Sequence, residues 1–224
     1  MHFHRHLNHA DDSGMLGFIA HTYPDERFHY FECNENHDAL TSPFNKSTSF
    51  AGSSNGLICL EGLESDCCIC ICNPITREYV MLPKPKEKTY VAGFGYVSST
   101  GEYKVLGLHH EFNKQGRDES EFAEVYVYTL GSGKGWRNLG NFISQLSFLH
   151  ISDGPGIFAN EALYWLDCEL EYILTLDLAE EKFCDHLSLP SLPQDGDWCH
   201  YGMGFCILLV VYVSIVADFS VFGY

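Results

Sequence analysis

The chain has 224 residues, of which 46% are hydrophobic and 14% aromatic, so it can bury a sizeable core in one or two domains and is not a disordered chain. Thirteen basic and thirty acidic residues give a net charge of −17, which excludes general binding to nucleic-acid phosphates and favours basic protein partners, mainly in association rate. Ten cysteines are too few for a disulfide scaffold, and the first ten residues lack the apolar core of a secretory signal, which together predict a cytoplasmic or nuclear setting.

The periodic signal along the chain is the two-residue alternation of β-strands. Short runs rich in β-branched and aromatic residues are bounded by Gly, Asn, Asp, Pro or Ser. These runs predict strands at residues 57–61, 68–72, 90–97, 103–109, 122–130, 162–167 and 172–178. No window of a dozen residues carries an apolar stripe at helical spacing. Many short strands with frequent turns predict an all-β fold that is a sandwich, a barrel or a propeller.

Three stretches of the chain repeat one layout: a turn and an apolar strand, a second strand, and a further turn that leads to an aromatic residue and a leucine. The marker aromatics Tyr79, Trp136 and Phe183 lie 57 and 47 residues apart. Repeats of this length are typical of propeller blades or of another all-β array. Because such arrays usually present a binding surface, the repeats favour a binding function over a catalytic one.

Two groups of residues resemble metal ligands. Four histidines lie between positions 2 and 9, and four cysteines lie in the segment 67–72. The histidines are interpreted as part of a polar terminus, because no acidic partner is spaced to orient them. The one-residue gaps place Cys68, Cys70 and Cys72 on one face of a strand, and zinc sites use wider gaps and a second ligand pair. We therefore expect small buried hydrophobes, no metal and no cofactor.

Several residues in the repeats have both a structural and a binding interpretation. Asn55-Gly56 and Asn73-Pro74 are strong turn signals and are expected to shape strand connections. Trp136 and Trp165 resemble interface anchors, but their repeat-related positions favour packing between blades.

Two arginines stand beside the turn signals. Arg77 next to Glu78, and Arg137 after Trp136, are expected to tie neighbouring strands through charge-assisted hydrogen bonds.

Catalysis has little support in the sequence. The chain lacks the phosphate-binding loop, the His-Glu-x-x-His zinc motif and the Gly-x-Ser-x-Gly serine motif. His109 and His110 precede Glu111, but adjacent strand residues point to opposite faces, which leaves at most one of the two near the carboxylate. We expect no catalytic residues and no enzymatic activity.

The apolar run at residues 205–217 raises a membrane question. It holds thirteen uncharged residues and ends at Asp218, whereas a bilayer span needs about 20. Its β-branched residues and the absence of a basic flank favour a buried strand over a membrane anchor, although a transmembrane segment is the alternative.

The repeats, taken in order, resemble the plant F-box-associated domain over about residues 50–190. The match runs from Ser53-Ser-Asn-Gly-Leu through Gly93-Phe-Gly-Tyr96 to Leu187-Ser-Leu-Pro190. The residues that carry it are Asn55, Gly56, Leu57, Asn73, Pro74, Arg77, Glu78, Leu82, Pro83, Gly93, Phe94, Gly95, Tyr96, Tyr103, Lys104, Val105, Trp136, Arg137, Trp165, Asp177, Phe183, Leu189 and Pro190. They are read as structural, and no substrate-binding residue is assigned.

The resemblance implies a kelch-like β-propeller that recruits protein targets for an SCF-type ubiquitin ligase, in which an F-box docks a Skp-type adaptor and cullin. Residues 1–50 show no F-box motif and are similar to the segment that follows it, including the first strands. Residues 51–190 are expected to form the β-domain, and residues 191–224 are expected to form divergent apolar C-terminal strands. We therefore expect an incomplete propeller that recruits a ligase only if an upstream F-box exists. The alternative is a stand-alone interaction or decoy domain, or a truncated gene product.

An incomplete propeller leaves strand edges and apolar blade faces exposed. The chain is accordingly expected to self-associate or to be poorly soluble unless a partner covers the open side.

Overall fold

The computed structural model describes residues 17–22, 27–32, 39–40, 48–62, 68–83, 85, 89–109, 122–143, 155–166, 172–184 and 187–188. Within these ranges every regular element is a β-strand, which confirms the predicted all-β class. The bounds are β1 Gly17–Thr22, β2 Arg27–Glu32, β3 Ala39–Leu40, β4 Thr48–Ser54, β5 Leu57–Gly62, β6 Ile69–Cys72, β7 Tyr79–Leu82, β8 Thr89–Val97, β9 Glu102–His109, β10 Phe122–Thr129, β11 Trp136–Ile143, β12 Ile157–Ala159, β13 Ala162–Leu166, β14 Tyr172–Asp177, β15 Lys182–Phe183 and β16 Leu187–Ser188.

The strands form four antiparallel sheets in chain order. Strands β1, β2 and β3 make a three-stranded sheet. Three further sheets have the orders β4-β5-β6-β7, β8-β9-β10-β11 and β12-β13-β14-β15, with β16 paired to β14. We call these three sheets blade 1, blade 2 and blade 3. Each is a meander in which consecutive strands pair, and among the described strands no strand of one blade pairs with a strand of another.

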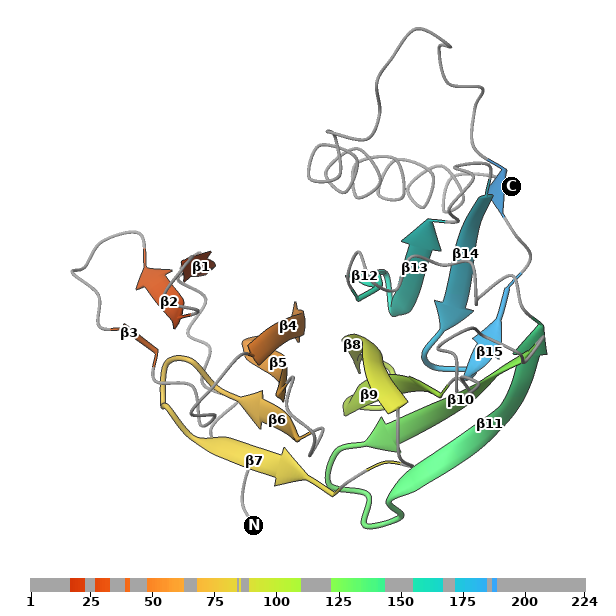
Figure 1. Ribbon diagram of the computed structural model, residues 1–224, viewed down its shortest axis with the longest axis horizontal. Coiled ribbons are helices and arrows are strands. Elements are labelled where there is room, and N and C mark those ends of the chain that lie inside the picture. The colour runs from red at the N-terminus through yellow and green to blue at the C-terminus, as the bar shows by residue number, and fades with distance from the viewer. Residues whose placement is uncertain are drawn as a thin grey trace, which may run out of the picture.

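The blades are arranged around a common centre (Figure 1). Their first strands β4, β8 and β12 contact one another, whereas β7 and β11 lie on the outer rim. This radial order is that of a β-propeller. Within the part of the chain that the structure describes, the sheets occupy an arc rather than a closed ring, as predicted.

An apolar core fills the interface between blades 1 and 2. On the blade 2 side, the ring of Phe94 stacks on that of Tyr103 with a centroid distance of 5.9 Å, and Tyr96 packs on Tyr103 at 4.7 Å. Blade 1 covers these rings with one face of its strands. That face consists of Ala51, Leu57, Cys59, Ile69, Ile71 and Leu82.

A second apolar core fills the interface between blades 2 and 3. Its buried side chains are Ala92, Val97, Leu106, Leu108, Ala123 and Val125 of blade 2 and Leu163, Trp165, Leu174, Leu176 and Leu178 of blade 3. Blade 2 is therefore packed on both faces, which explains why its two inner strands read as nearly continuous apolar runs.

Two glycines on β8 let blade 3 come close. A Cβ atom at Gly93 would lie 2.7 Å from Leu163 Cδ1, and one at Gly95 would lie 2.3 Å from Phe158 Cδ2. The intervening Phe94 points to the other side, into the core with blade 1. The Gly-Phe-Gly pattern thus follows the strand alternation: glycine where a neighbouring blade needs room, and an aromatic ring where there is a core to fill.

Some predicted features lie outside the described residues. These are the N-terminal histidines, His110 and Glu111, the motif residues Leu189 and Pro190, and the apolar run 205–217. In the described ranges, no helix is long and apolar enough to cross a bilayer.

Candidate functional site

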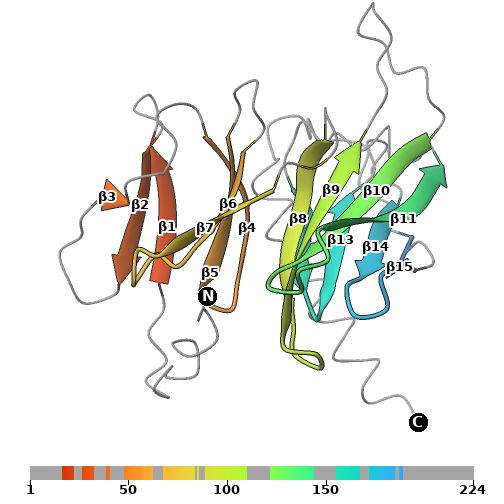
Figure 2. The same ribbon diagram turned by 90° about the horizontal axis from the view of Figure 1, so that it is seen from below.

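Six hairpin turns lie at one end of the blades. In an antiparallel meander, the turn between strands one and two and the turn between strands three and four leave the sheet at the same end. Figure 2 shows the β4–β5, β8–β9 and β14–β15 turns together along the lower edge of the molecule. We call this end the turn face. It consists of residues 55–56, 73–78, 98–101, 130–135, 160–161 and 178–181.

The turn between β4 and β5 bonds to blade 2. Asn55 and Gly56 both have positive φ (44° and 79°), which is the type I′ geometry that matches the twist of a hairpin. The Asn55 side-chain amide donates to the Tyr103 hydroxyl (3.1 Å), and this hydroxyl donates to the Asn55 carbonyl (2.9 Å). Burial raises the pKa of Tyr103 to about 12, so the hydroxyl stays a donor at neutral pH. Leu57, the next residue, starts β5 in the core.

The turn between β6 and β7 is organised by Asn73. Its Oδ1 accepts hydrogen bonds from the N–H of Ile75 (2.9 Å) and of the next residue (3.2 Å), so Pro74 stands where no donor is needed. The backbone N–H of Arg77, at φ 59°, donates to the Asn73 carbonyl, and the N–H of Asn73 donates to the Glu78 carbonyl (2.9 Å each). These bonds close the turn and leave Ile75 62% exposed at its tip.

Trp136 and Trp165 both lie between blades, where their repeat-related positions predict packing. The buried Trp165 donates from Nε1 to the Ala92 carbonyl of blade 2 (3.1 Å), and its ring packs against Phe183. Trp136, at the start of β11, donates from Nε1 to the Pro83 carbonyl at the end of blade 1 (2.9 Å). Each indole therefore connects its own blade to the preceding one.

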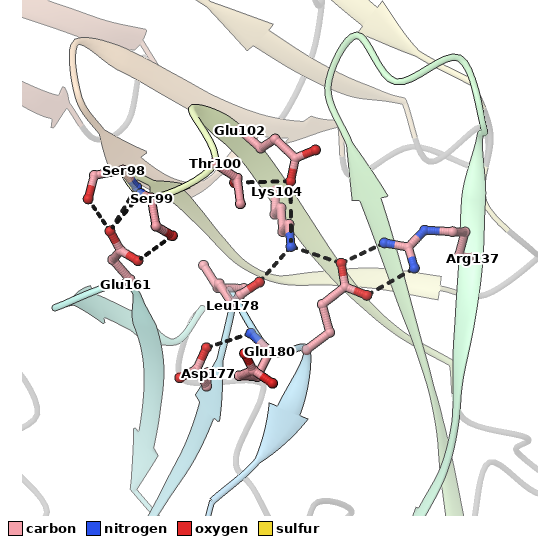
Figure 3. A network of polar contacts seen from close by, with 11 residues as sticks. Ser98, Ser99, Thr100, Glu102, Lys104, Arg137, Glu161, Asp177, Leu178 and Glu180 are labelled. Atoms are coloured by element: carbon pink, nitrogen blue, oxygen red, sulfur yellow. Dashed lines mark hydrogen bonds and ion pairs between the residues drawn. The ribbon is translucent and has the colours of Figure 1, made fainter.

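A charged network joins blades 2 and 3 at the turn face (Figure 3). The Glu181 carboxylate accepts two hydrogen bonds from the Arg137 guanidinium (2.6 and 2.9 Å) and one from Lys104 Nζ (2.9 Å). Lys104 also donates to the Leu178 carbonyl (2.6 Å) and lies 3.8 Å from Glu102. Its side chain is only 4% exposed, so the ammonium is a buried charge that depends on these partners.

The electrostatics of this network favour the ionised carboxylate. Burial alone would raise the pKa of Glu181, but the hydrogen bonds from Arg137 and Lys104 outweigh burial, and the pKa lies below its usual value. The same contact raises the pKa of Arg137, mainly through its hydrogen bond to the carboxylate.

A second carboxylate on blade 3 bonds to the β8–β9 turn of blade 2 (Figure 3). Glu161 Oε1 accepts hydrogen bonds from the backbone N–H of Ser98 (2.8 Å) and from its hydroxyl. Ser99 donates from its N–H to Oε1 and from its hydroxyl to Oε2, both at 3.3 Å. The hydrogen bond from the Ser98 side chain is the main cause that lowers the pKa of Glu161, followed by those from the backbone and from Ser99.

Both bridging glutamates occupy positions that glycine usually takes. Glu161 has φ 61° and Glu181 has φ 56°, values in the left-handed region. Sequence reasoning missed both residues, because a charged residue in a turn is normally a solvated one. A glutamate at a turn position that favours glycine or asparagine is the only signal that could have found them.

Other motif residues lie in an apolar core or close a hairpin turn. Leu82 and Val105 are buried in the core between blades 1 and 2. Asp177 Oδ1 accepts a hydrogen bond from the N–H of Glu180 (2.8 Å) and closes the β14–β15 turn. The structure thus brings Lys104 and Arg137 together on Glu181, while other described motif residues lie in the two blade interfaces or in the hairpin turns.

The cysteines of strand β6 lie in an apolar cluster of blade 1. Cys70 and Cys72 pack with Ile58 and Leu60 on the face of blade 1 that is turned away from blade 2, whereas Ile69 and Ile71 face blade 2. No group of three or more metal-ligating side chains occurs in the described ranges.

Chemically, the two carboxylates that bridge blades 2 and 3 are both engaged: Glu181 binds two cations, and Glu161 accepts hydrogen bonds from the β8–β9 turn. This arrangement holds the blades in fixed positions and presents the remaining turn side chains to solvent.

Comparison with known proteins adds a family. A family model described as the F-box associated beta propeller domain matches residues 8–203. Three relatives from Arabidopsis thaliana are F-box protein At5g49610 (33% identical over 150 residues), F-box protein At3g07870 (32% over 156 residues) and F-box protein DOR (32% over 99 residues). The matches cover 62%, 59% and 42% of this chain, but only 40%, 36% and 22% of the relatives.

Among solved structures, a chain of a nidogen/laminin complex matches over 76% of this chain and 79% of its own length. Its sequence identity is 10% and the TM-score is 0.36, which is too low to support any argument about function.

Proposed function

The chain belongs to the F-box associated β-propeller domain family, and we propose that it is the substrate-recognition module of an SCF-type ubiquitin ligase. In this role it holds a protein target and performs no chemistry on it. The observation that carries the proposal is the family match over residues 8–203, which includes all three blades. The relatives named as F-box proteins support the ligase context, which we place in the cytoplasm or the nucleus.

The physical basis of the proposal is a rigid scaffold with exposed turns. Apolar cores and buried hydrogen bonds fix the blades relative to one another, so side chains on the turn face are held in place before a target arrives. Such preorganisation lowers the entropic cost of binding. The net charge of −17 favours a target with a basic surface through faster association.

We place the target on the turn face, with Ile75 as an anchor. Ile75 is the most exposed of the large hydrophobic residues in the described ranges. It stands at the tip of a turn that Asn73 holds closed, so an apolar side chain is presented on a rigid support. Anchors of this kind supply much of the energy of protein interfaces.

A matched pair of variants tests this placement. Crosslinking of the full chain in plant extract, followed by mass spectrometry, identifies a target, whose binding is then measured with purified proteins. Ile75→Ser is expected to weaken that binding about tenfold without a change in Tm. Met81→Ser, which alters another exposed hydrophobic residue of the same hairpin (42% exposed), is the control and is expected to bind normally. Equal binding by both variants would exclude the turn face.

The alternative is a stand-alone interaction or decoy domain, which binds the same target without recruiting a ligase. Size-exclusion chromatography of the chain with a purified Skp-type adaptor separates the two. Co-elution supports ligase function, whereas target binding without co-elution supports the alternative.

A further inference from the structure

The β8–β9 turn carries three exposed hydroxyl side chains at the junction of blades 2 and 3. Ser98, Ser99 and Thr100 are all exposed, and they connect the two inner strands of blade 2. Figure 3 shows the first two serines directed at the Glu161 carboxylate of blade 3. A small chemical change at this turn therefore acts directly on a contact between blades.

Glu161 occupies its place at a cost. Its backbone has φ 61°, in the left-handed region that residues with a Cβ atom rarely adopt. Hydrogen bonds from two backbone N–H groups and two hydroxyls offset this cost, and the carboxylate is ionised at neutral pH. The contact of Glu161 with the β8–β9 turn therefore requires that the turn donates hydrogen bonds and carries no negative charge.

The sequence around Ser99 suits a class of enzyme that would add such a charge. Glu102 stands three residues after Ser99, whereas Gly101 stands three residues after Ser98. An acidic residue at the third following position is the charge pattern that acid-directed serine kinases select in their substrates. Of the two serines that contact Glu161, only Ser99 therefore fits this class.

We propose that Ser99 is a phosphorylation site, and that its modification loosens the contact between blades 2 and 3. An acid-directed protein kinase transfers the γ-phosphoryl group of ATP to Ser99 Oγ. The new O–P bond forms as the bond between the γ-phosphorus and the β,γ-bridging oxygen breaks, ADP leaves, and the hydroxyl proton passes to the catalytic base of the kinase. The product replaces a neutral donor by a group with a charge of about −2 beside a carboxylate.

Phosphorylation of Ser99 is expected to cause electrostatic repulsion between the phosphate and the Glu161 carboxylate. The phosphate cannot donate to Glu161 as the hydroxyl does, and like charges at this distance destabilise each other. Lys104 and Arg137, which bridge the same two blades, are both bonded to Glu181, and Lys104 also lies 3.8 Å from Glu102, whose carboxylate accepts a hydrogen bond from Thr100 of the turn. Among the described residues, neither cation is bonded to Ser98, Ser99 or Glu161. The contact through Glu161 is weakened, while the apolar core and the Glu181 network keep the blades associated.

The experiment uses the full chain, a kinase of the casein kinase II type and ATP. Mass spectrometry is expected to place a phosphate on Ser99 and none in Ser99→Ala, while a standard acidic peptide confirms that the kinase is active. The phosphorylated protein is expected to melt about 2–4 °C lower than the unmodified protein. In Glu161→Gln most of this difference is expected to disappear, because the repelling charge is gone.

A phosphomimetic pair supplies the control. Ser99→Asp is expected to lower the Tm, whereas Ser132→Asp is not, because Ser132 lies exposed in the β10–β11 turn, where its hydroxyl accepts from the Lys134 N–H. If the active kinase left Ser99 unmodified, the proposal that Ser99 is a phosphorylation site would be wrong. If phosphorylation left the Tm unchanged, or lowered the Tm of Glu161→Gln as much as that of the wild type, the proposed weakening of the contact between blades 2 and 3 would be wrong. None of these measurements requires a target, so they stand or fall separately from the proposed function.

Discussion

Replacing Glu181 by glutamine should weaken the junction between blades 2 and 3 more than any other single change in the turn face. Glu181 is the shared acceptor of Lys104 and Arg137, and glutamine keeps its size but removes its charge. One amide oxygen cannot accept all three hydrogen bonds. Lys104 would then be a nearly buried ammonium whose remaining partners are the Leu178 carbonyl at 2.6 Å and Glu102 at 3.8 Å.

The size of the effect follows from burial. A hydrogen bond to a charged group contributes about 1.5–3 kcal/mol, and breaking a fully buried ion pair costs about 3–5 kcal/mol. Glu181 is 17% exposed and Arg137 is 38% exposed, so solvent reduces the loss for the arginine pair. We expect a loss of about 2–3 kcal/mol in the free energy of unfolding, which lowers the Tm by about 5–10 °C in a chain of this size.

The assay is urea unfolding followed by tryptophan fluorescence, with Glu180→Gln as the matched control. Glu180 is the adjacent residue, 70% exposed, and its ion pair with Lys182 spans 3.6 Å in solvent. Its loss should change the unfolding free energy by about 0.5 kcal/mol or less. If Glu181→Gln and Glu180→Gln proved equally stable, the assignment of Glu181 as the inter-blade acceptor would be wrong.

The pH dependence gives an independent check. The pKa of Glu181 is lower in the folded chain than in the unfolded chain, where it has its usual value of 4.5. A group of this kind stabilises the fold above the unfolded pKa, and the stabilisation is lost as the pH falls through the folded pKa. The stability difference between wild type and Glu181→Gln should therefore be constant near neutral pH and should shrink below pH 4.5.

Three further predictions concern the blade interfaces. Gly95→Ala should lower the free energy of unfolding by about 1–3 kcal/mol in urea titration, because the added methyl group overlaps two blade 3 side chains; a neutral result would show that blade 3 can move away. Trp165→Phe should cost about 2 kcal/mol in the same titration through loss of the Nε1 hydrogen bond to Ala92 and of ring volume. Spectrophotometric titration of the folded chain should show a tyrosine that ionises at about pH 12, and Tyr103→Phe should remove it.

The sequence was sufficient to predict the strands that carry strong alternation. All seven predicted runs correspond to strands, with ends that differ by one residue at most. The marker aromatics Tyr79, Trp136 and Phe183 also fall at equivalent places, each at the first or second residue of the fourth strand of its blade. These features are local, because a strand pattern and a turn signal are set by neighbouring residues.

The features that were missed depend on the neighbouring blade. Strand β4 reads Thr-Ser-Phe-Ala-Gly-Ser-Ser and strand β12 has three residues, so neither has an apolar alternation of its own. Both are inner strands that contact β8, so their place in the fold is set by the neighbouring blade and not by a pattern of their own. Glu161 and Glu181 were missed for the same reason, since their partners lie more than 40 residues away in sequence.

The positions of the motif residues also restrict which of them can contact a target. Phe94, Tyr103, Trp136 and Trp165 lie in the blade interfaces, and Lys104 is buried between blades 2 and 3. Side chains that are used to join blades are not available to a target. The motif residues that join blades therefore determine the scaffold, and a protein target bound at the turn face would contact side chains that project from the turns into solvent, such as Ile75.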